Sequence, residues 1–216
     1  MSFDFRESTA LFGGSFNPPH LGHTQAIHGL LKNPGVKKIM VLPSFGTPLK
    51  KVSISFEQRM EMTKLAFRGI AQVEISDFEY QNQTQYSWQL LEKLGPELKN
   101  PAFVIGTDQF EKLDQWSKFP AFLGLCDWII LLRKPTSLDS ISPIIKKYAG
   151  TGMLIATDNR DEFTLQGRRV KFVETEAIEA SSTQIREDFA LKKGNAMKEL
   201  IAADVRDYIL RNKIYG

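Results

Sequence analysis

The chain of 216 residues contains one cysteine, Cys126, so it can form neither an internal disulfide nor a cysteine-rich metal site. It also lacks a long apolar run. The longest, residues 119–132, is interrupted by Pro120 and Asp127 and is shorter than the ~20 residues that a membrane-spanning helix needs. The N-terminal stretch has acidic residues and no apolar segment, which predicts no signal peptide. These absences predict a cytoplasmic protein in a reducing compartment, with no membrane partner.

Dense clusters of one charge are absent as well. The net charge is +3, and 42% of the residues are hydrophobic while 25% are charged, which is typical of a globular protein. Without a concentrated run of lysine and arginine, the sequence does not predict a nucleic-acid partner. The mildly basic balance suits small anionic ligands.

Short apolar runs alternate with segments of helical period along the chain. Strands are expected at 9–14, 37–43, 72–77, 102–108 and 127–133, with weaker candidates at 153–157 and 170–174. Helices are expected at about 20–33, 56–68, 83–95 and 138–149, with short helical pieces within 109–126. Runs rich in valine and isoleucine indicate strands covered on both faces. The sequence therefore predicts an α/β fold with a doubly wound, mainly parallel sheet.

The length fits one domain over residues 1–216. After Ser181 two helical patterns, 184–193 and 197–212, follow without a strand candidate between them, which predicts a helical C-terminal part at about 181–216. Residues 44–55 and 156–169 read as surface loops. In an open α/β sheet, ligands bind in the loops at the carboxyl ends of the strands.

All histidines of the chain lie in "GGSFNPPHLGHTQAIHG", residues 13–29. Gly13 and Gly14 end a predicted strand, and a helix is expected to begin near His20. The free amide groups and the dipole of a helix N-terminus form an anion site, most often for phosphate. His20 and His23 would share one face of the first turn and could donate hydrogen bonds to phosphate oxygens. We read His28, which lies further along, as structural.

Two other readings of this stretch stay open. The spacing His-x-x-His can also bind zinc, but zinc needs a further ligand, and no carboxylate or thiol lies between Glu7 and Glu57. We therefore assign no metal ligand. The dinucleotide fingerprint G-x-G-x-x-G is absent, which disfavours a hydride-transferring enzyme.

A second candidate site lies in "EASSTQIRED", residues 179–188. Ser181, Ser182 and Thr183 are favourable residues for the start of a helix, and Arg186 follows Thr183 on the same side. Hydroxyl, amide and guanidinium groups would then converge on one point, as a polyphosphate site requires. Helix capping alone explains this segment equally well.

The two stretches together resemble the paired signatures of the nucleotidyltransferase superfamily with a His-x-Gly-His motif. The chain is most similar to the bacterial nicotinate-nucleotide adenylyltransferase family, because the matches extend along it in order: "YSWQLLEKL", "VIGTDQFEKLDQW", "LLRKP" and "VRDYILRNKIYG". The resemblance implies a Rossmann-like nucleotidyltransferase fold. It also implies transfer of AMP from ATP, carried with Mg²⁺, to nicotinate mononucleotide, giving nicotinate adenine dinucleotide and pyrophosphate in NAD biosynthesis.

By position, the resemblance implies that His20 and His23 hold the ATP phosphates and stabilise the transferring phosphoryl group. Arg186 would grip the departing phosphates and is the third predicted catalytic residue. The residues expected to bind ATP are Gly13, Gly14, Ser15, Phe16, Gly106, Asp108, Ser182 and Thr183. The residues expected near the acceptor are Lys50, Ser87 and Trp116. For Trp116, core packing is an equally simple reading.

The chain departs from the family pattern at three positions. Leu49 stands where members often carry histidine, Ser87 where threonine is common, and Ser117 where an aromatic residue is frequent. Leu49 removes one possible phosphate donor from the loop. Ser87 and Ser117 leave the choice between nicotinate and nicotinamide mononucleotide open. Three further functions stay open: transfer to phosphopantetheine, nucleotide binding without turnover, and hydrolysis at a zinc ion. A homodimer stays open too.

Overall fold

A central sheet organises the computed structural model, which describes residues 3–46, 54–176, 178, 180–191 and 198–216. Within these residues the eight strands lie in the order β3-β2-β1-β4-β5-β8-β7-β6. The pairings from β3 to β8 are parallel, whereas β7 is antiparallel to both of its neighbours. The predicted doubly wound, mainly parallel sheet is confirmed. The strands are β1 (Thr9–Gly14), β2 (Lys38–Pro43), β3 (Val73–Ile75), β4 (Pro101–Gly106), β5 (Asp127–Arg133), β6 (Leu154–Ala156), β7 (Glu162–Leu165) and β8 (Arg168–Thr175).

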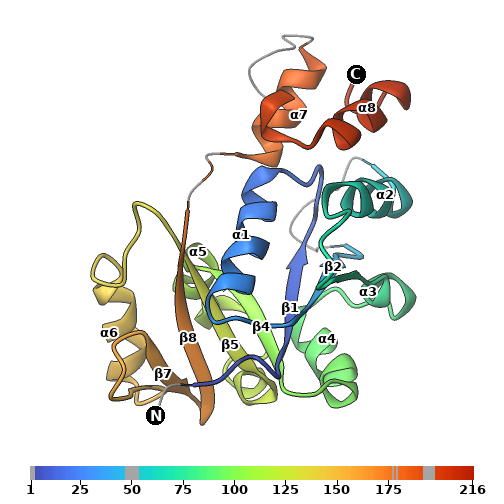
Figure 1. The fold of residues 1–216 in the computed structure, drawn as a ribbon. Coiled ribbons are helices and arrows are strands. Elements are labelled where there is room, and N and C mark those ends of the chain that lie inside the picture. The colour runs from blue at the N-terminus through green and yellow to red at the C-terminus, as the bar shows by residue number, and fades with distance from the viewer. Residues whose placement is uncertain (1–2, 47–53, 177, 179, 192–197) are drawn as a thin grey trace.

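Helices cover both faces of the sheet (Figure 1). Leu11 and Phe12, neighbours in β1, belong to separate buried clusters on opposite faces, as parallel strands require. One cluster includes residues of α1, and the other includes residues of α4 to α6. No helix among the described residues is long and apolar enough to cross a membrane. The helices are α1 (Leu21–Lys32), α2 (Phe56–Ala66), α3 (Phe78–Gln81), α4 (Ser87–Leu94), α5 (Thr107–Glu111), α6 (Ser142–Gly150), α7 (Ser182–Ala190) and α8 (Ala203–Arg211). Short 3₁₀ turns occupy Gly95–Glu97, Leu113–Gln115, Ala121–Leu125 and Lys198–Leu200.

The C-terminal helices α7 and α8 lie beyond the carboxyl end of β1, at the top of Figure 1. A third buried cluster joins them to α2: it contains Met62 of α2, Ile185 of α7, and Val205 and Ile209 of α8. The predicted helical C-terminal part is therefore present, and it packs where the loop between β1 and α1 also lies.

The expectation of a loop at 156–169 was wrong. Strand β7 lies inside this range and pairs with β6 and β8. The turn between β7 and β8 is formed by Gln166 and Gly167, whose φ angles of 50° and 77° are typical of a two-residue hairpin turn. The polar residues 157–161 before the strand concealed it in the sequence.

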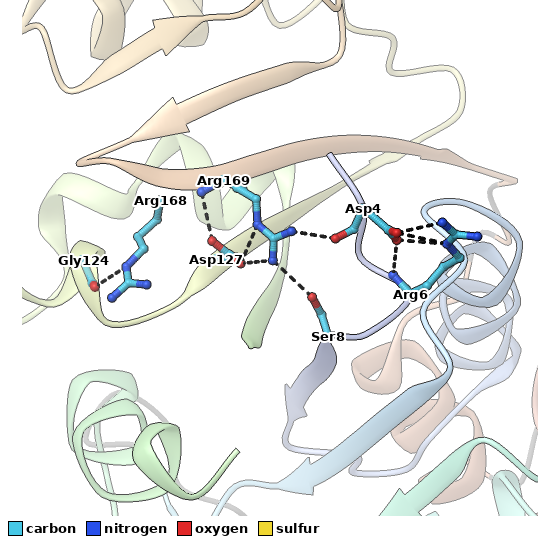
Figure 2. A network of polar contacts seen from close by, with 7 residues as sticks. All are labelled: Asp4, Arg6, Ser8, Gly124, Asp127, Arg168 and Arg169. Carbon is cyan, nitrogen blue, oxygen red and sulfur yellow. Dashed lines mark hydrogen bonds and ion pairs between the residues drawn. The ribbon is translucent and has the colours of Figure 1, made fainter. Parts of the chain in front are cut away.

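At the amino-terminal ends of the strands, opposite the carboxyl ends near which α7 and α8 lie, a polar network holds the N-terminal segment (Figure 2). Asp127 begins β5 and accepts hydrogen bonds on one carboxylate oxygen from Nε and Nη2 of Arg169, at 2.9 and 2.5 Å. The Nη1 group of Arg169 donates to the carbonyl of Asp4 at 2.6 Å. This network ties residues near the N-terminus to β5 and β8, far from the carboxyl edge.

Candidate active site

The loop between β1 and α1 has a tightly turned backbone. Phe16 adopts a left-handed conformation with φ of 45°. An added Cβ at Gly14 would lie 3.0 Å from the Phe16 ring, whereas one at Gly13 would meet no atom within 4 Å. The Phe16 side chain is buried, edge-on to His23 and Phe67 with ring centroids 5.1 and 6.0 Å away. The ring therefore supports the imidazole from the core, and only the backbone of Phe16 is left to contact a ligand.

The two predicted histidines lie against each other. His20 precedes α1 as its N-cap residue, and His23 is in the first turn. Their ring centroids are 3.7 Å apart and the ring planes differ by 34°. The backbone N–H of His20 donates to Nδ1 of His23 at 3.1 Å. Because Nδ1 accepts this bond, we assign the proton of neutral His23 to Nε2.

Burial sets the charge of this pair. Together with the nearby charge of Arg133, which has the smaller effect, it lowers the pKa of His20 to about 4. Burial likewise holds the pKa of His23 well below its usual value, with smaller contributions from His20 and Arg133. Both imidazoles are therefore neutral at pH 7. His20 Nδ1 is buried without a hydrogen-bond partner in the described part of the chain.

Arg133 is a further residue of this site, and the sequence motifs predict no role for it. It ends β5, next to β4 and β8 in the sheet, and its charge acts on both imidazoles. Its position at the carboxyl end of a buried strand was the available signal, because such ends form one edge of a parallel sheet.

The segment at α7 meets the histidine loop directly. Nη1 of Arg186 donates to the carbonyl of Asn17 at 2.8 Å, and Nη2 donates to Oγ1 of Thr183 at 3.2 Å. The hydroxyl of Ser182 donates to the carbonyl of Pro18 at 2.9 Å. Two segments separated by more than 160 positions thus form one site, in which Arg186 keeps further N–H donors for a ligand.

Gly22, between the two histidines, lies where these segments meet. An added Cβ there would be 3.0 Å from the His20 ring and 3.4 Å from the carbonyl of Ile178, in the segment that leads to α7. The first distance is shorter than an ordinary van der Waals contact, and the second is at the lower limit of one. A side chain at this position would therefore force either the His20 imidazole or the segment that leads to α7 to move.

The predicted nucleotide contacts after β4 lie on the same edge of the sheet. Gly106 ends β4, which pairs with β1 on one side and β5 on the other. An added Cβ at Gly106 would lie 2.6 Å from Oδ1 of Asp108, so glycine lets this carboxylate approach the backbone. Asp108 is exposed in the first turn of α5. It is open to contact a ligand bound over the edge.

Two of the three predicted acceptor residues, Trp116 and Ser87, lie on the other face of the sheet from the histidines. Trp116 is partly buried and stacks on Phe122 with ring centroids 6.0 Å apart and planes 10° apart. Ser87 is the first residue of α4 and is partly buried. No contact within the described residues joins either of them to the histidine pair. Lys50, like Leu49, lies outside the described residues.

The donor set of the site fits phosphate. Around the histidines stand hydroxyl, amide and guanidinium groups, which donate hydrogen bonds to anions. Among the described residues there is no group of three or more histidine, cysteine, aspartate or glutamate residues that could hold a metal ion. The histidine pair therefore lacks the ligands that a zinc hydrolase would need in this part of the chain.

Comparison with known proteins identifies the family of the chain. Residues 11–188 match the family model described as cytidylyltransferase-like. A protein of Leptospira interrogans named "Probable nicotinate-nucleotide adenylyltransferase" is 30% identical over 214 residues, which cover 96% of each chain. This chain belongs to the nicotinate-nucleotide adenylyltransferase family. A second family member of the same name, from Hydrogenobaculum sp., is 29% identical over 210 residues, which cover 96% of this chain and 97% of that one.

A solved structure supports the assignment of the fold. The nicotinic acid mononucleotide adenylyltransferase of Plasmodium falciparum, complexed with NaAD, has a TM-score of 0.72 and 18% sequence identity. The superposition covers 97% of both chains. The predicted Rossmann-like nucleotidyltransferase fold is thereby confirmed.

Proposed function

We propose that this protein transfers AMP from MgATP to nicotinate mononucleotide, forming nicotinate adenine dinucleotide and pyrophosphate for NAD biosynthesis. The observation that carries the proposal is the junction of the two segments: Arg186 donates to Asn17, three residues before His20, and His20 stacks against His23. The names of the relatives support the reaction, and the ligand of the Plasmodium enzyme, NaAD, is its expected product.

The reaction needs no side-chain nucleophile. A phosphate oxygen of nicotinate mononucleotide attacks the α-phosphorus of ATP, the new P–O bond forms, and the bond from the α-phosphorus to the bridging oxygen breaks. The electron pair of that bond leaves with pyrophosphate. Since the attacking group is already an anion, positioning and charge stabilisation supply the catalysis.

The neutral imidazoles suit this task. Nε2–H of His23 can donate a hydrogen bond to an α-phosphate oxygen as charge develops there, and His20 is positioned beside it. Neutral donors of this kind stabilise the charge that develops on the α-phosphate in the transition state. Arg186, Ser182 and Thr183 would hold the β- and γ-phosphates that leave.

Mg²⁺ enters as part of the substrate MgATP. The ATP phosphates would supply its oxygen ligands, since the described residues beside the histidines supply hydroxyl, imidazole and guanidinium groups instead of carboxylates.

Gly106 and Asp108 would contact the nucleotide. Trp116 and Ser87 would form the acceptor side, across the edge of the sheet. We regard residues 1–216 as one domain, in which α7 supplies the second phosphate segment.

A rate comparison tests the proposal. Nicotinate mononucleotide, nicotinamide mononucleotide and phosphopantetheine are each supplied with MgATP, and pyrophosphate release is measured. We expect the highest kcat/KM with nicotinate mononucleotide. A higher value with another acceptor would assign the chain to a sibling activity. ATP binding without pyrophosphate from any acceptor would identify a binding module instead.

A further inference from the structure

A strained residue lies at the centre of the histidine loop. The left-handed backbone of Phe16 is rare for an aromatic residue and persists only where surrounding contacts fix it. Its two chain neighbours, Ser15 and Asn17, are held by side chains from other parts of the fold. The loop conformation therefore depends on those contacts.

On one side, Arg59 holds Ser15. Nη1 of Arg59, in α2, donates to the carbonyl of Ser15 at 2.9 Å. Arg59 is only 1% exposed, and its Nε has no hydrogen-bond partner in the described part of the chain. Among the described residues no carboxylate lies within ion-pair distance of it. The carboxylates of Glu79 and Glu57 act on Arg59 only from beyond that distance. Burying an arginine without a close ion pair is costly, and an apolar residue would fill the same space at lower cost.

On the other side, Tyr215 holds Asn17. The hydroxyl of Tyr215, the penultimate residue, donates to Oδ1 of Asn17 at 2.6 Å. Asn17 is buried, and its carbonyl accepts from Arg186. The side chain and the backbone of Asn17 are thus both fixed, by groups that come from the C-terminal helical part.

We propose that Arg59 and Tyr215 are positioning residues that hold the loop on both sides of Phe16 and so present the histidine pair and the loop amides to the nucleotide. Neither residue needs to touch the substrate. The catalytic consequence rests on the proposed adenylyltransferase function, whereas the effect on nucleotide binding does not. The C-terminus of the chain thereby becomes part of the active-site architecture.

The variants Arg59→Met and Tyr215→Phe test this role. Each removes a hydrogen bond to the loop and keeps the bulk of the side chain. Arg68→Met, an exposed arginine just after α2, and Tyr208→Phe, on α8, are the matched controls. The affinity for a non-hydrolysable ATP analogue with Mg²⁺ is measured by calorimetry, together with Tm, kcat and both KM values.

We expect each test variant to weaken analogue binding ~10-fold and to lower kcat ~10- to 100-fold, because small displacements of catalytic groups have effects of this size. The KM for nicotinate mononucleotide stays at the value of the control variants. Because both residues act on one loop, the double variant loses less than the product of the two single losses.

Analogue affinity equal to that of the controls would overturn the proposal, and so would a loss of Tm as the only change. If Arg59→Met does not fold, Tyr215→Phe alone decides, since it removes one oxygen atom. A wild-type protein that binds the analogue but releases no pyrophosphate would refute the proposed function, while the affinities still test the two positioning residues.

Discussion

The backbone N–H of His20 donates to Nδ1 of His23, while the two imidazoles lie 3.7 Å apart between centroids. The first residue of the motif thus fixes the tautomer of the second and leaves Nε2–H of His23 as a donor. This relationship explains why the spacing His-x-x-His serves a phosphate site here: the N-cap position of α1 brings the His20 amide to the His23 ring.

We predict that His20→Ala and His23→Ala each lower kcat by ~10² or more, because groups that stabilise developing charge contribute on this scale. His28→Ala is the control: His28 is exposed in the same helix, and its removal should leave kcat at the wild-type value. Pyrophosphate release under saturating substrates gives the comparison. Wild-type kcat in either test variant would remove that histidine from the mechanism.

Arg186→Ala should act chiefly on ATP. The variant loses a phosphate donor and also the bond to the Asn17 carbonyl, so we expect the KM for ATP to rise ~10-fold or more. The KM for nicotinate mononucleotide should change little. Arg211→Ala, an exposed arginine at the end of α8, serves as the control. An unchanged ATP saturation curve would contradict the role given to Arg186.

Stability should depend on pH through the histidine pair. In the unfolded chain a histidine takes up a proton below pH 6.5, whereas folded His20 does so only near its lowered pKa of about 4. The unfolded state therefore binds more protons in this window, and the free energy of unfolding falls as the pH is lowered from 6.5 towards 4. The slope is at most ~1.4 kcal/mol per pH unit for each such group.

The comparison uses the difference between the wild type and His20→Asn. This difference cancels the contribution of Glu79, whose pKa burial raises to about 7 and which therefore has the opposite sign in an overlapping pH range. Urea unfolding at several pH values should show a shallower dependence for the variant. Parallel curves would mean that His20 is protonated in the folded protein as readily as in the unfolded one.

Asp127→Asn should destabilise the fold without affecting catalysis. The substitution leaves the Arg169 guanidinium without its carboxylate, and breaking such a partly buried pair costs about 3 kcal/mol. The pair lies at the amino edge of the sheet, so kcat should stay unchanged at temperatures where the variant is folded. Glu7→Gln, which breaks the exposed pair with Lys99, should leave stability close to the wild-type value, because exposed ion pairs contribute little. Equal destabilisation by both variants would contradict this assignment.

The sequence predicted the elements that carry the site because each has a strong local signal. Gly13 and Gly14 mark the end of β1, and the helical period from His20 onward marks α1, which begins one residue later. The seryl and threonyl residues before Arg186 mark α7, which begins at Ser182. Such signals depend on a few neighbouring residues and so can be read without the rest of the fold.

Long-range relationships could not be read in this way. Ser15 and Arg59 are far apart in the sequence, and so are Asn17 and Tyr215. The hydrogen bonds between them form only in the folded chain and leave no local signal in the sequence. From its place in the sequence Phe16 is expected to line the nucleotide loop, whereas its left-handed backbone turns the ring into the core against Phe67. Strand β7 was missed because its four residues follow a polar stretch.

The most direct test of the central claim is a crystal structure with a non-hydrolysable ATP analogue and Mg²⁺. The account predicts that one triphosphate accepts hydrogen bonds both from the His20 and His23 imidazoles and from the Arg186 guanidinium. A triphosphate that contacts only one of the two segments, or that binds away from the carboxyl edge of the sheet, would contradict it.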